Sequence, residues 1–276
     1  MKYYTEVKMS AGLLLNSTIC FAIGISSISF AWVLLAKNEQ YSENSRPALF
    51  SLVVFWTLVG LTYLPTAVRM FIAYLGNQEM DATLYFITAI PFAFIPVPLV
   101  FFIIYVITGS TRVGEYIALI FTLIGAAYLA FLYSSGIVGP VVTEWGSIFM
   151  INSDAAIHIY LMGLFVIPTS MILGLLLLIL LQRMPKRLRY KTVLPLVAIS
   201  FVFDFMLTDV IAIIDVIQVF SRLFVLLGTV LAYLAYFPPT TIQEKLGIQE
   251  HMADIHYNGQ KDPNIDFFLK DKSGNP

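Results

Sequence analysis

Seven long apolar runs constrain the fold of this chain more than any other feature of its sequence. A helix needs about 20 mostly apolar residues to cross the roughly 30 Å hydrocarbon core of a bilayer. The runs that reach this length are 10–36, 49–75, 83–108, 114–134, 157–181, 192–214 and 217–237. Because the runs are continuous and do not alternate, they predict helices rather than barrel strands. We expect an all-α membrane protein, with a seven-transmembrane helix bundle in residues 1–239 and a tail in residues 240–276.

The composition supports a bilayer as the solvent. Of the 276 residues, 59% are hydrophobic and 12% are charged, against roughly 45–50% and 25% in soluble domains. A water-soluble domain of this size has too little interior to bury that much apolar surface. The net charge of −1 gives no basic stripe for nucleic acid. The single cysteine excludes an internal disulfide and a cysteine-only metal site.

The distribution of basic residues predicts the orientation, because cytoplasmic flanks hold the excess of Lys and Arg. A basic cluster separates spans five and six, and it consists of Arg183, Lys186, Arg187, Arg189 and Lys191. The loops on the other side are acidic, with Glu79, Asp81, Glu144, Asp154 and Asp215. We therefore expect a multi-pass protein of the cell membrane with its N-terminus outside and its C-terminus inside. The basic cluster is the expected contact for an intracellular protein partner.

The two ends of the chain raise separate questions. Lys2 and Lys8 precede the first span as in a signal peptide, but the apolar run is too long and no A-x-A site follows, so we expect it to be retained. In the tail, residues 240–256 predict a short helix on the inner membrane surface, and the polar residues 258–276 predict a mobile end. Such a tail is too short for a kinase or cyclase domain, so output is expected to pass to a separate partner.

Two features predict departures from a regular bundle. Prolines within spans two, three and five can kink helices by removing backbone hydrogen bonds, and they are Pro65, Pro91, Pro96, Pro98 and Pro168. The longest external loop, 136–156, contains a β-like run near 141–151. This loop fits either a hairpin over the bundle or a segment lying in the headgroup layer.

Four charged residues fall within the apolar spans, and they are Arg69, Asp204, Asp209 and Arg222. A charge in hydrocarbon costs about 2.5–3.5 kcal/mol on insertion scales, so each needs a partner or a wet cavity. At 1.5 Å per residue, Arg69, Asp209 and Arg222 all lie about 7–11 Å outward of their span centres. We expect these three to form one layer of paired charges. Asp204 lies near the centre, where a long arginine or a water is expected to satisfy it.

Helical spacing groups further polar residues with these charges. Asp204 and Thr208 share a face of span six, and Gln218, Arg222 and Tyr233 share a face of span seven. The candidate ligand-binding or switch residues are Arg69, Asp204, Thr208, Asp209, Gln218, Arg222 and Tyr233. Such a layer also fits a purely structural role, in which ion pairs fix helix order, and it fits an ion pathway.

Catalysis has little support in this sequence. No nucleophile–base set and no cluster of metal ligands falls at one depth, and His251 and His256 with Asp254 match no standard ligand spacing. We therefore expect no enzyme activity, no cofactor and no metal. The middle of span seven reads Phe224-Val-Leu-Leu-Gly-Thr-Val230, without the lysine to which retinal is bound in microbial rhodopsins.

The layout resembles the seven-helix sensory region that precedes the kinase in some prokaryotic membrane histidine kinases. The features that carry the resemblance are the external Trp145-Gly146 loop, the basic turn 183–191 and the ending Tyr233-Leu-Ala-Tyr-Phe-Pro-Pro239. What the resemblance implies is a sensor-like or scaffold-like role, without assigning any functional residue.

Three functions therefore remain open. The first is a receptor-like or sensor-like protein that binds a small ligand in the outward half of the bundle and signals to an intracellular partner. The others are a non-catalytic structural subunit of a membrane complex and a transporter of small solutes or ions. A cavity between spans two, six and seven would favour the first, whereas a fully packed interior would favour the subunit.

Overall fold

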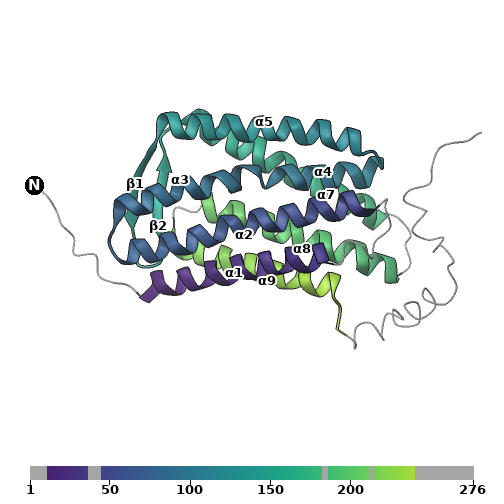
Figure 1. Cartoon of the computed structure of the whole chain (residues 1–276), viewed down its shortest axis with the longest axis horizontal. Coiled ribbons are helices and arrows are strands. Elements are labelled where there is room, and N and C mark those ends of the chain that lie inside the picture. Colours follow the sequence, from purple (N-terminus) through teal and green to yellow (C-terminus); the bar gives the residue numbers. More distant parts are fainter. Residues whose placement is uncertain (1–10, 37–44, 182–185, 212–213, 240–276) are drawn as a thin grey trace, which may run out of the picture.

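A computed structural model describes residues 11–36, 45–181, 186–211 and 214–239 of the chain. Within the helix that holds span six, side chains are described from Val193 to Asp209. The helices run side by side along the long axis of the molecule, and a pair of strands lies at one end (Figure 1). The expected tail and residue Arg183 of the basic cluster lie outside the described residues, as do the side chains of Lys186, Arg187, Arg189 and Lys191.

Six helical segments of the described residues are long and apolar enough to cross a membrane. They are α1 (Ala11–Ala36), α2 (Arg46–Tyr74), α3 with α4 (Gln78–Thr108), α5 (Thr111–Ser135), the segment from α6 to α7 (Asp154–Leu181) and α9 (Asp215–Tyr236). The helix α8 (Lys186–Ile211) has 26 residues and packs between α7 and α9. The multi-pass membrane architecture expected from the apolar runs is therefore confirmed at the level of these six segments.

Span three is interrupted just before Pro96, which follows Pro91 and is itself followed by Pro98. It consists of α3 (Gln78–Phe94) and α4 (Pro96–Thr108), which meet at Ile95. Pro96 has no N–H, and the Ile95 N–H bonds to the carbonyl of Phe92 three residues earlier rather than four. By contrast, Pro65 lies within the continuous helix α2 and Pro91 within α3.

Span five is irregular near its proline. It begins as the short helix α6 (Asp154–His158), continues as the π-helix η3 (Ile159–Val166) and ends as α7 (Ile167–Leu181). The Ile167 N–H bonds to the carbonyl of Met162 five residues earlier, directly before Pro168. Because Pro168 has no N–H, a regular α-helix would lack one backbone hydrogen bond at this position. The wider π-turn lies directly before it. Such π-turns are frequent at functional sites.

The external loop forms a β-hairpin, as one of its two interpretations predicted. Strand β1 (Ile137–Val142) pairs antiparallel with β2 (Ser147–Ile151), and a register shift falls between Val138 and Val141. In the turn, Thr143 and Gly146 are joined by a 2.8 Å backbone hydrogen bond. On the adjoining helix, Asn16 Nδ2 donates to the Trp145 carbonyl at 2.6 Å. The hairpin is therefore held against the start of α1.

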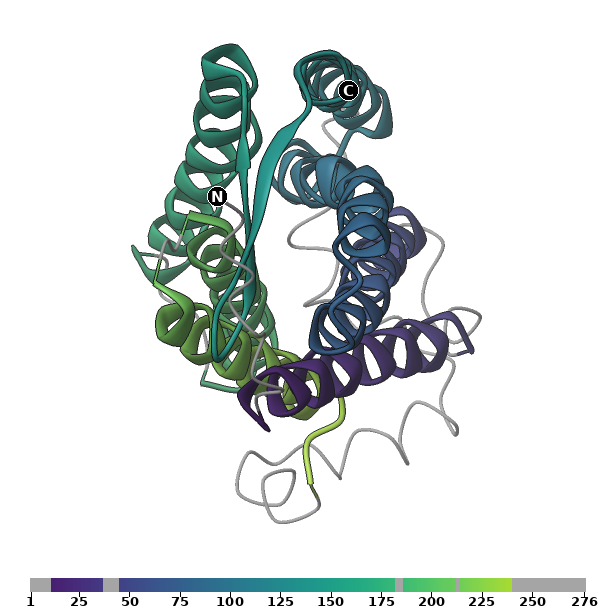
Figure 2. The same ribbon diagram turned by 90° about the vertical axis from the view of Figure 1, so that its left-hand side faces the viewer.

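The helices form a ring around a space that the hairpin crosses. Neighbours in the ring are α1 with α2 and α9, α8 with α9 and α7, and α5 with α3, α4 and η3. Figure 2 looks onto the hairpin end and shows both strands lying across the opening of this ring. Away from the hairpin the interior is packed with aromatic and aliphatic side chains, including Phe30, Phe55 and Trp56. These aromatic side chains therefore fill the interior between α1 and α2 in that half of the bundle.

Candidate functional site

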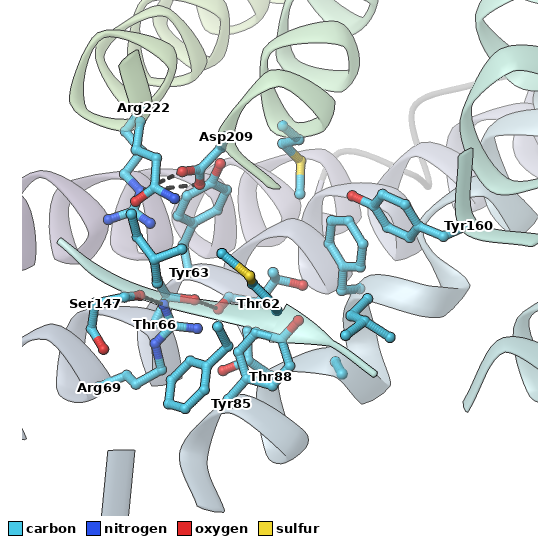
Figure 3. A pocket seen from close by; sticks show the side chains of 18 of the residues that line it. Thr62, Tyr63, Thr66, Arg69, Tyr85, Thr88, Ser147, Tyr160, Asp209 and Arg222 are labelled. Atoms are coloured by element: carbon cyan, nitrogen blue, oxygen red, sulfur yellow. Dashed lines mark hydrogen bonds and ion pairs between the residues drawn. The ribbon is translucent and has the colours of Figure 1, made fainter. Parts of the chain in front are cut away.

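A cavity of about 480 Å³ lies behind the hairpin, inside the ring of helices. Its wall combines residues from α2, α3, α5, β2, the start of span five, α8 and α9. The polar and charged residues of the lining are Thr62, Tyr63, Thr66, Arg69, Tyr85, Thr88, Tyr128, Ser147, Tyr160, Asp209, Gln218 and Arg222 (Figure 3). Spans two, six and seven, where the sequence predicted a cavity or a packed layer, all contribute to this wall.

One end of the polar wall is an ion pair between α8 and α9. Nε of Arg222 donates to Oδ1 of Asp209 at 2.9 Å and to Oδ2 at 3.0 Å. Both residues are buried, with 3% and 8% of their surfaces exposed. Tyr63 on α2 lies beside this ion pair in the cavity wall (Figure 3). The pairing of Asp209 with Arg222 at matched depth is therefore present in the structure.

Arg69 is paired with a different carboxylate, so the predicted three-member layer with Asp209 is wrong in this detail. Its Nε lies 3.3 Å from Oδ1 of Asp81, and its Nη2 donates to the Ser147 carbonyl at 2.9 Å. The Ser147 hydroxyl in turn donates to Asp81. The Arg69 guanidinium also lies 5.3 Å from the ring centre of Tyr85, within the range of a cation–π contact. Arg69 thus joins α2 to α3 and to the hairpin.

Asp81 was expected in an external loop, and its place in the structure is a correction. The side chain of Asn77 accepts a hydrogen bond from the Met80 N–H and caps α3, which begins at Gln78. Asp81 therefore lies in the first turn, where the helix dipole favours a carboxylate. Its side chain is fully buried. The signal that could have found it is the Asn77 cap, which starts span three five residues before the apolar run at 83.

Asp204 is satisfied without the arginine or water that its depth predicted. The hydroxyls of Thr169 on α7 and Ser200 on α8 donate to its two carboxylate oxygens, each at 3.0 Å. Thr208 donates to the Asp204 backbone carbonyl within the same helix. Asp204 and Thr208 are outside the cavity lining, because this face of α8 packs against α7.

The polar face of α9 that periodicity predicted lies on the cavity along only part of its length. Gln218 and Arg222 line the cavity, whereas Tyr233 does not. Tyr233 is 48% exposed and its ring contacts those of Phe30 and Phe237. Eleven residues of helix separate Tyr233 from Arg222, which is about 16 Å along the axis. The shared face therefore continues past the cavity into the aromatic packing of the opposite half.

Several residues of the site were missed by the sequence. Tyr63, Tyr85, Tyr128, Tyr160 and Ser147 all line the cavity. Aromatic residues in membrane helices face lipid or pack by default, so periodicity alone gave no reason to select these tyrosines. The position of Ser147 depends on the hairpin, which decides which strand residues face inward.

The described residues include no group of three or more His, Cys, Asp or Glu placed to hold a metal ion. What they do provide is a set of hydrogen-bond donors around an apolar interior. Two of these donors, Nη1 of Arg222 and the Tyr160 hydroxyl, have no hydrogen-bond partner within the described part of the chain, and a third, Nε of Arg69, contacts Asp81 only as an ion pair. Figure 3 shows Arg222 beside Asp209 on one side of the cavity and Tyr160 on the other.

Comparison with protein-family models, with curated protein sequences and with solved structures finds no match to this chain. The chemistry of the cavity therefore has to be inferred from its own residues.

Proposed function

We propose that this chain is a receptor-like or sensor-like membrane protein that binds a small ligand in the cavity and signals to a separate intracellular partner. The observation that carries the proposal is a cavity of about 480 Å³ inside the ring of helices, lined by charged, hydroxyl and aromatic groups. Small-ligand sites are typically concave, about 300–1,000 Å³ in volume, and mostly apolar with a few placed polar groups. The cavity has each of these properties.

The proposal includes seven spans with the hairpin outside. The helix α8 is as long as α1 at 26 residues, and it packs between α7 and α9 as a span would. The hairpin end carries Glu79, Glu144 and Asp154, whereas α7 ends at Leu181 at the opposite end, shortly before the basic cluster of residues 183–191 in the sequence. With basic residues inside, the cavity would open toward the outer face and the tail would lie in the cytoplasm.

The proposed switch is the pair of Asp209 and Arg222. It joins α8 to α9, and both residues line the cavity. A ligand that competes for Arg222 would weaken this bond, and the α8–α9 pair would then shift at its inner end against the basic cluster. A ligand can shift such an equilibrium only by its difference in affinity for the two arrangements. A ligand that contacts the ion pair directly would bind the paired and the separated arrangement with different affinities.

The structural-subunit alternative is less favoured by this geometry. Ion pairs that only fix helix order can be closely packed, and they need no cavity beside them. The transporter alternative needs a polar path toward the other face. Near that face, the described residues that line the hollow between α4 and α7 are all apolar, among them Ile103, Leu175 and Leu178.

The test uses the full chain in lipid nanodiscs exposed to a small-molecule extract of cells that express it. Native mass spectrometry is expected to detect a small molecule retained by the wild type. Ala89→Phe fills the cavity wall and should abolish retention. The matched control Ala126→Phe makes the same change at an exposed position of α5 and should retain the molecule. Equal retention by all three proteins, or by none, would contradict ligand binding in this cavity.

A second measurement addresses signalling. Spin labels at Leu181→Cys on α7 and Leu227→Cys on α9 occupy exposed positions, 82% and 46% exposed. Addition of the retained molecule is expected to change the distance distribution between the labels by several ångströms, a shift typical of helix movements in switches. An unchanged distribution in the presence of bound molecule would contradict the sensor function.

A further inference from the structure

Three buried donors of the cavity wall lack a hydrogen-bond partner among the described residues, and one of them, Nε of Arg69, is ion-paired with Asp81. The other two are Nη1 of Arg222 and the hydroxyl of Tyr160, and each residue is 3% exposed. Buried polar groups in folded proteins are normally paired, because an unpaired group loses its hydration without replacement. Since both residues line the cavity, a molecule in the cavity can supply the missing partners.

The geometry at Arg222 selects the kind of partner. Both carboxylate oxygens of Asp209 bond to one guanidinium nitrogen, Nε. A guanidinium has five N–H donors in a planar fork that matches a carboxylate or another oxyanion. Nη1 is not used by this ion pair and has no acceptor among the described residues. An anionic oxygen forms the stronger bond there, because charge-assisted hydrogen bonds are roughly twice as strong as neutral ones.

The placement of the charges favours the same sign of ligand. Each arginine of the wall has one carboxylate partner, Asp81 for Arg69 and Asp209 for Arg222, so the four charges balance. Both arginines belong to the lining, whereas Asp81 lies off it. A cationic ligand would therefore lie closer to both guanidinium groups than to the carboxylate that neutralises one of them, in a site where charges are weakly screened.

The remaining residues of the wall indicate the chemical character of the uncharged part of the ligand. The rings of Tyr85, Phe92, Tyr128 and Phe149 line the cavity together with aliphatic side chains. Aromatic side chains provide large apolar contact areas and favour offset or edge-to-face stacking with another ring. From these contacts we infer that the ligand is a small organic anion with an aromatic or apolar body, whose anionic group is held by Arg222. This inference rests on the proposed ligand-binding function and specifies its chemistry.

The first experiment compares three probes of nearly the same shape on the wild-type chain in nanodiscs. They are 4-phenylbutyrate, 4-phenylbutanamide and 4-phenylbutylammonium, and isothermal titration calorimetry measures each Kd. Loss of a charge-assisted hydrogen bond corresponds to a loss of about tenfold or more in affinity. The acid is expected to bind at least about tenfold more tightly than the amide, and the ammonium is expected not to bind.

Variants of the ion pair provide a second, independent readout. Asp209→Asn removes the carboxylate that competes for Arg222, so the acid is expected to bind several-fold more tightly than to the wild type. The double variant Asp209→Asn with Arg222→Gln removes the anchor without leaving a lone charge, and it should bind acid and amide equally. The matched control Asp154→Asn removes an exposed acidic group at the same end of the bundle. It should leave the Kd of the acid unchanged.

Three results would overturn the inference. Amide or ammonium binding as tight as acid binding to the wild type would show that the site does not select an anion, while ligand binding itself would stand. Binding of none of the three probes would reject the aryl anion, whereas the extract screen described above decides the proposed function separately. An equal gain in acid affinity with Asp154→Asn and Asp209→Asn would show a general charge effect rather than contact with Arg222. If Asp209→Asn does not fold, the three probes on the wild type decide.

Discussion

Arg222 on α9 and Asp209 on α8 meet through a single guanidinium nitrogen, which lies 2.9 and 3.0 Å from the two carboxylate oxygens. This geometry joins two consecutive antiparallel helices at one depth and leaves Nη1 without an acceptor among the described residues. The same ion pair is therefore both part of the bundle's packing and part of the cavity wall. Its energetic coupling is the first quantity to measure.

A double-mutant cycle tests the pairing of Asp209 with Arg222. Removing one partner of a buried pair leaves an uncompensated charge and costs about 3–5 kcal/mol, so Asp209→Asn and Arg222→Gln should each lower the free energy of unfolding substantially. The double variant should be more stable than the sum of the singles predicts, by about 1–3 kcal/mol. Unfolding of the full chain in mixed detergent micelles measures all four proteins. Additive effects would contradict the pair.

The hairpin is expected to loosen when its link to α3 is removed. The Ser147 hydroxyl donates to Asp81, which also pairs with Arg69. Ser147→Ala leaves a buried carboxylate with one acceptor unpaired, at a cost of about 1–3 kcal/mol. Hydrogen exchange of the strand amides in 137–151 should become at least several-fold faster. The control Ser170→Ala removes a hydroxyl that bonds only within its own exposed helix face, and it should leave hairpin exchange unchanged.

Gly125 allows a close approach between α5 and α3. A Cβ at this position would lie 2.7 Å from the Ala93 carbonyl oxygen, which belongs to the backbone and cannot rotate away. We expect Gly125→Ala to lower the free energy of unfolding by about 1–3 kcal/mol through overpacking. At Gly174 in α7 an added Cβ would meet no atom within 4 Å. Gly174→Ala should therefore be neutral or slightly stabilising, since alanine is the better helix former, and equal losses in thermal unfolding would contradict the proposed contact.

The proposed orientation predicts opposite labelling at the two ends of the bundle. Glu144→Cys lies in the exposed hairpin turn, and Arg112→Cys lies at the exposed start of α5 at the other end. A membrane-impermeant maleimide added to intact cells should label the first and reach the second only after permeabilisation. The native Cys20 is fully buried, so the wild type should give no background. The reverse pattern would show that the hairpin faces the cytoplasm.

The sequence alone was enough to identify the membrane-crossing segments. Hydrocarbon imposes a minimum apolar length on every spanning helix and requires backbone groups to be paired within the segment. Six of the predicted runs correspond to six apolar helices of the described residues, with ends that differ by a few residues. The break in span three and the irregular turn in span five also occur next to prolines that the sequence singled out.

The partners of the buried charges depended on the packing. The depth of Asp209 and Arg222 could be counted along each helix, and consecutive antiparallel helices bring equal depths together. The partner of Arg69 could not be found in this way, because Asp81 becomes part of a buried helix turn only when Asn77 caps α3 and the hairpin packs over it. Tyr63 and Tyr160 likewise became part of a site only when the ring of helices placed them on one cavity.

The sequence therefore determined which segments form long apolar helices and how far along each helix the charged residues of the apolar runs lie, since both follow from distances counted along single helices. Only the tertiary structure decided which charges meet, which donors stay unpaired and where the interior is hollow. These depend on how each helix is rotated and which helix is its neighbour, and those properties are set by packing across the whole ring.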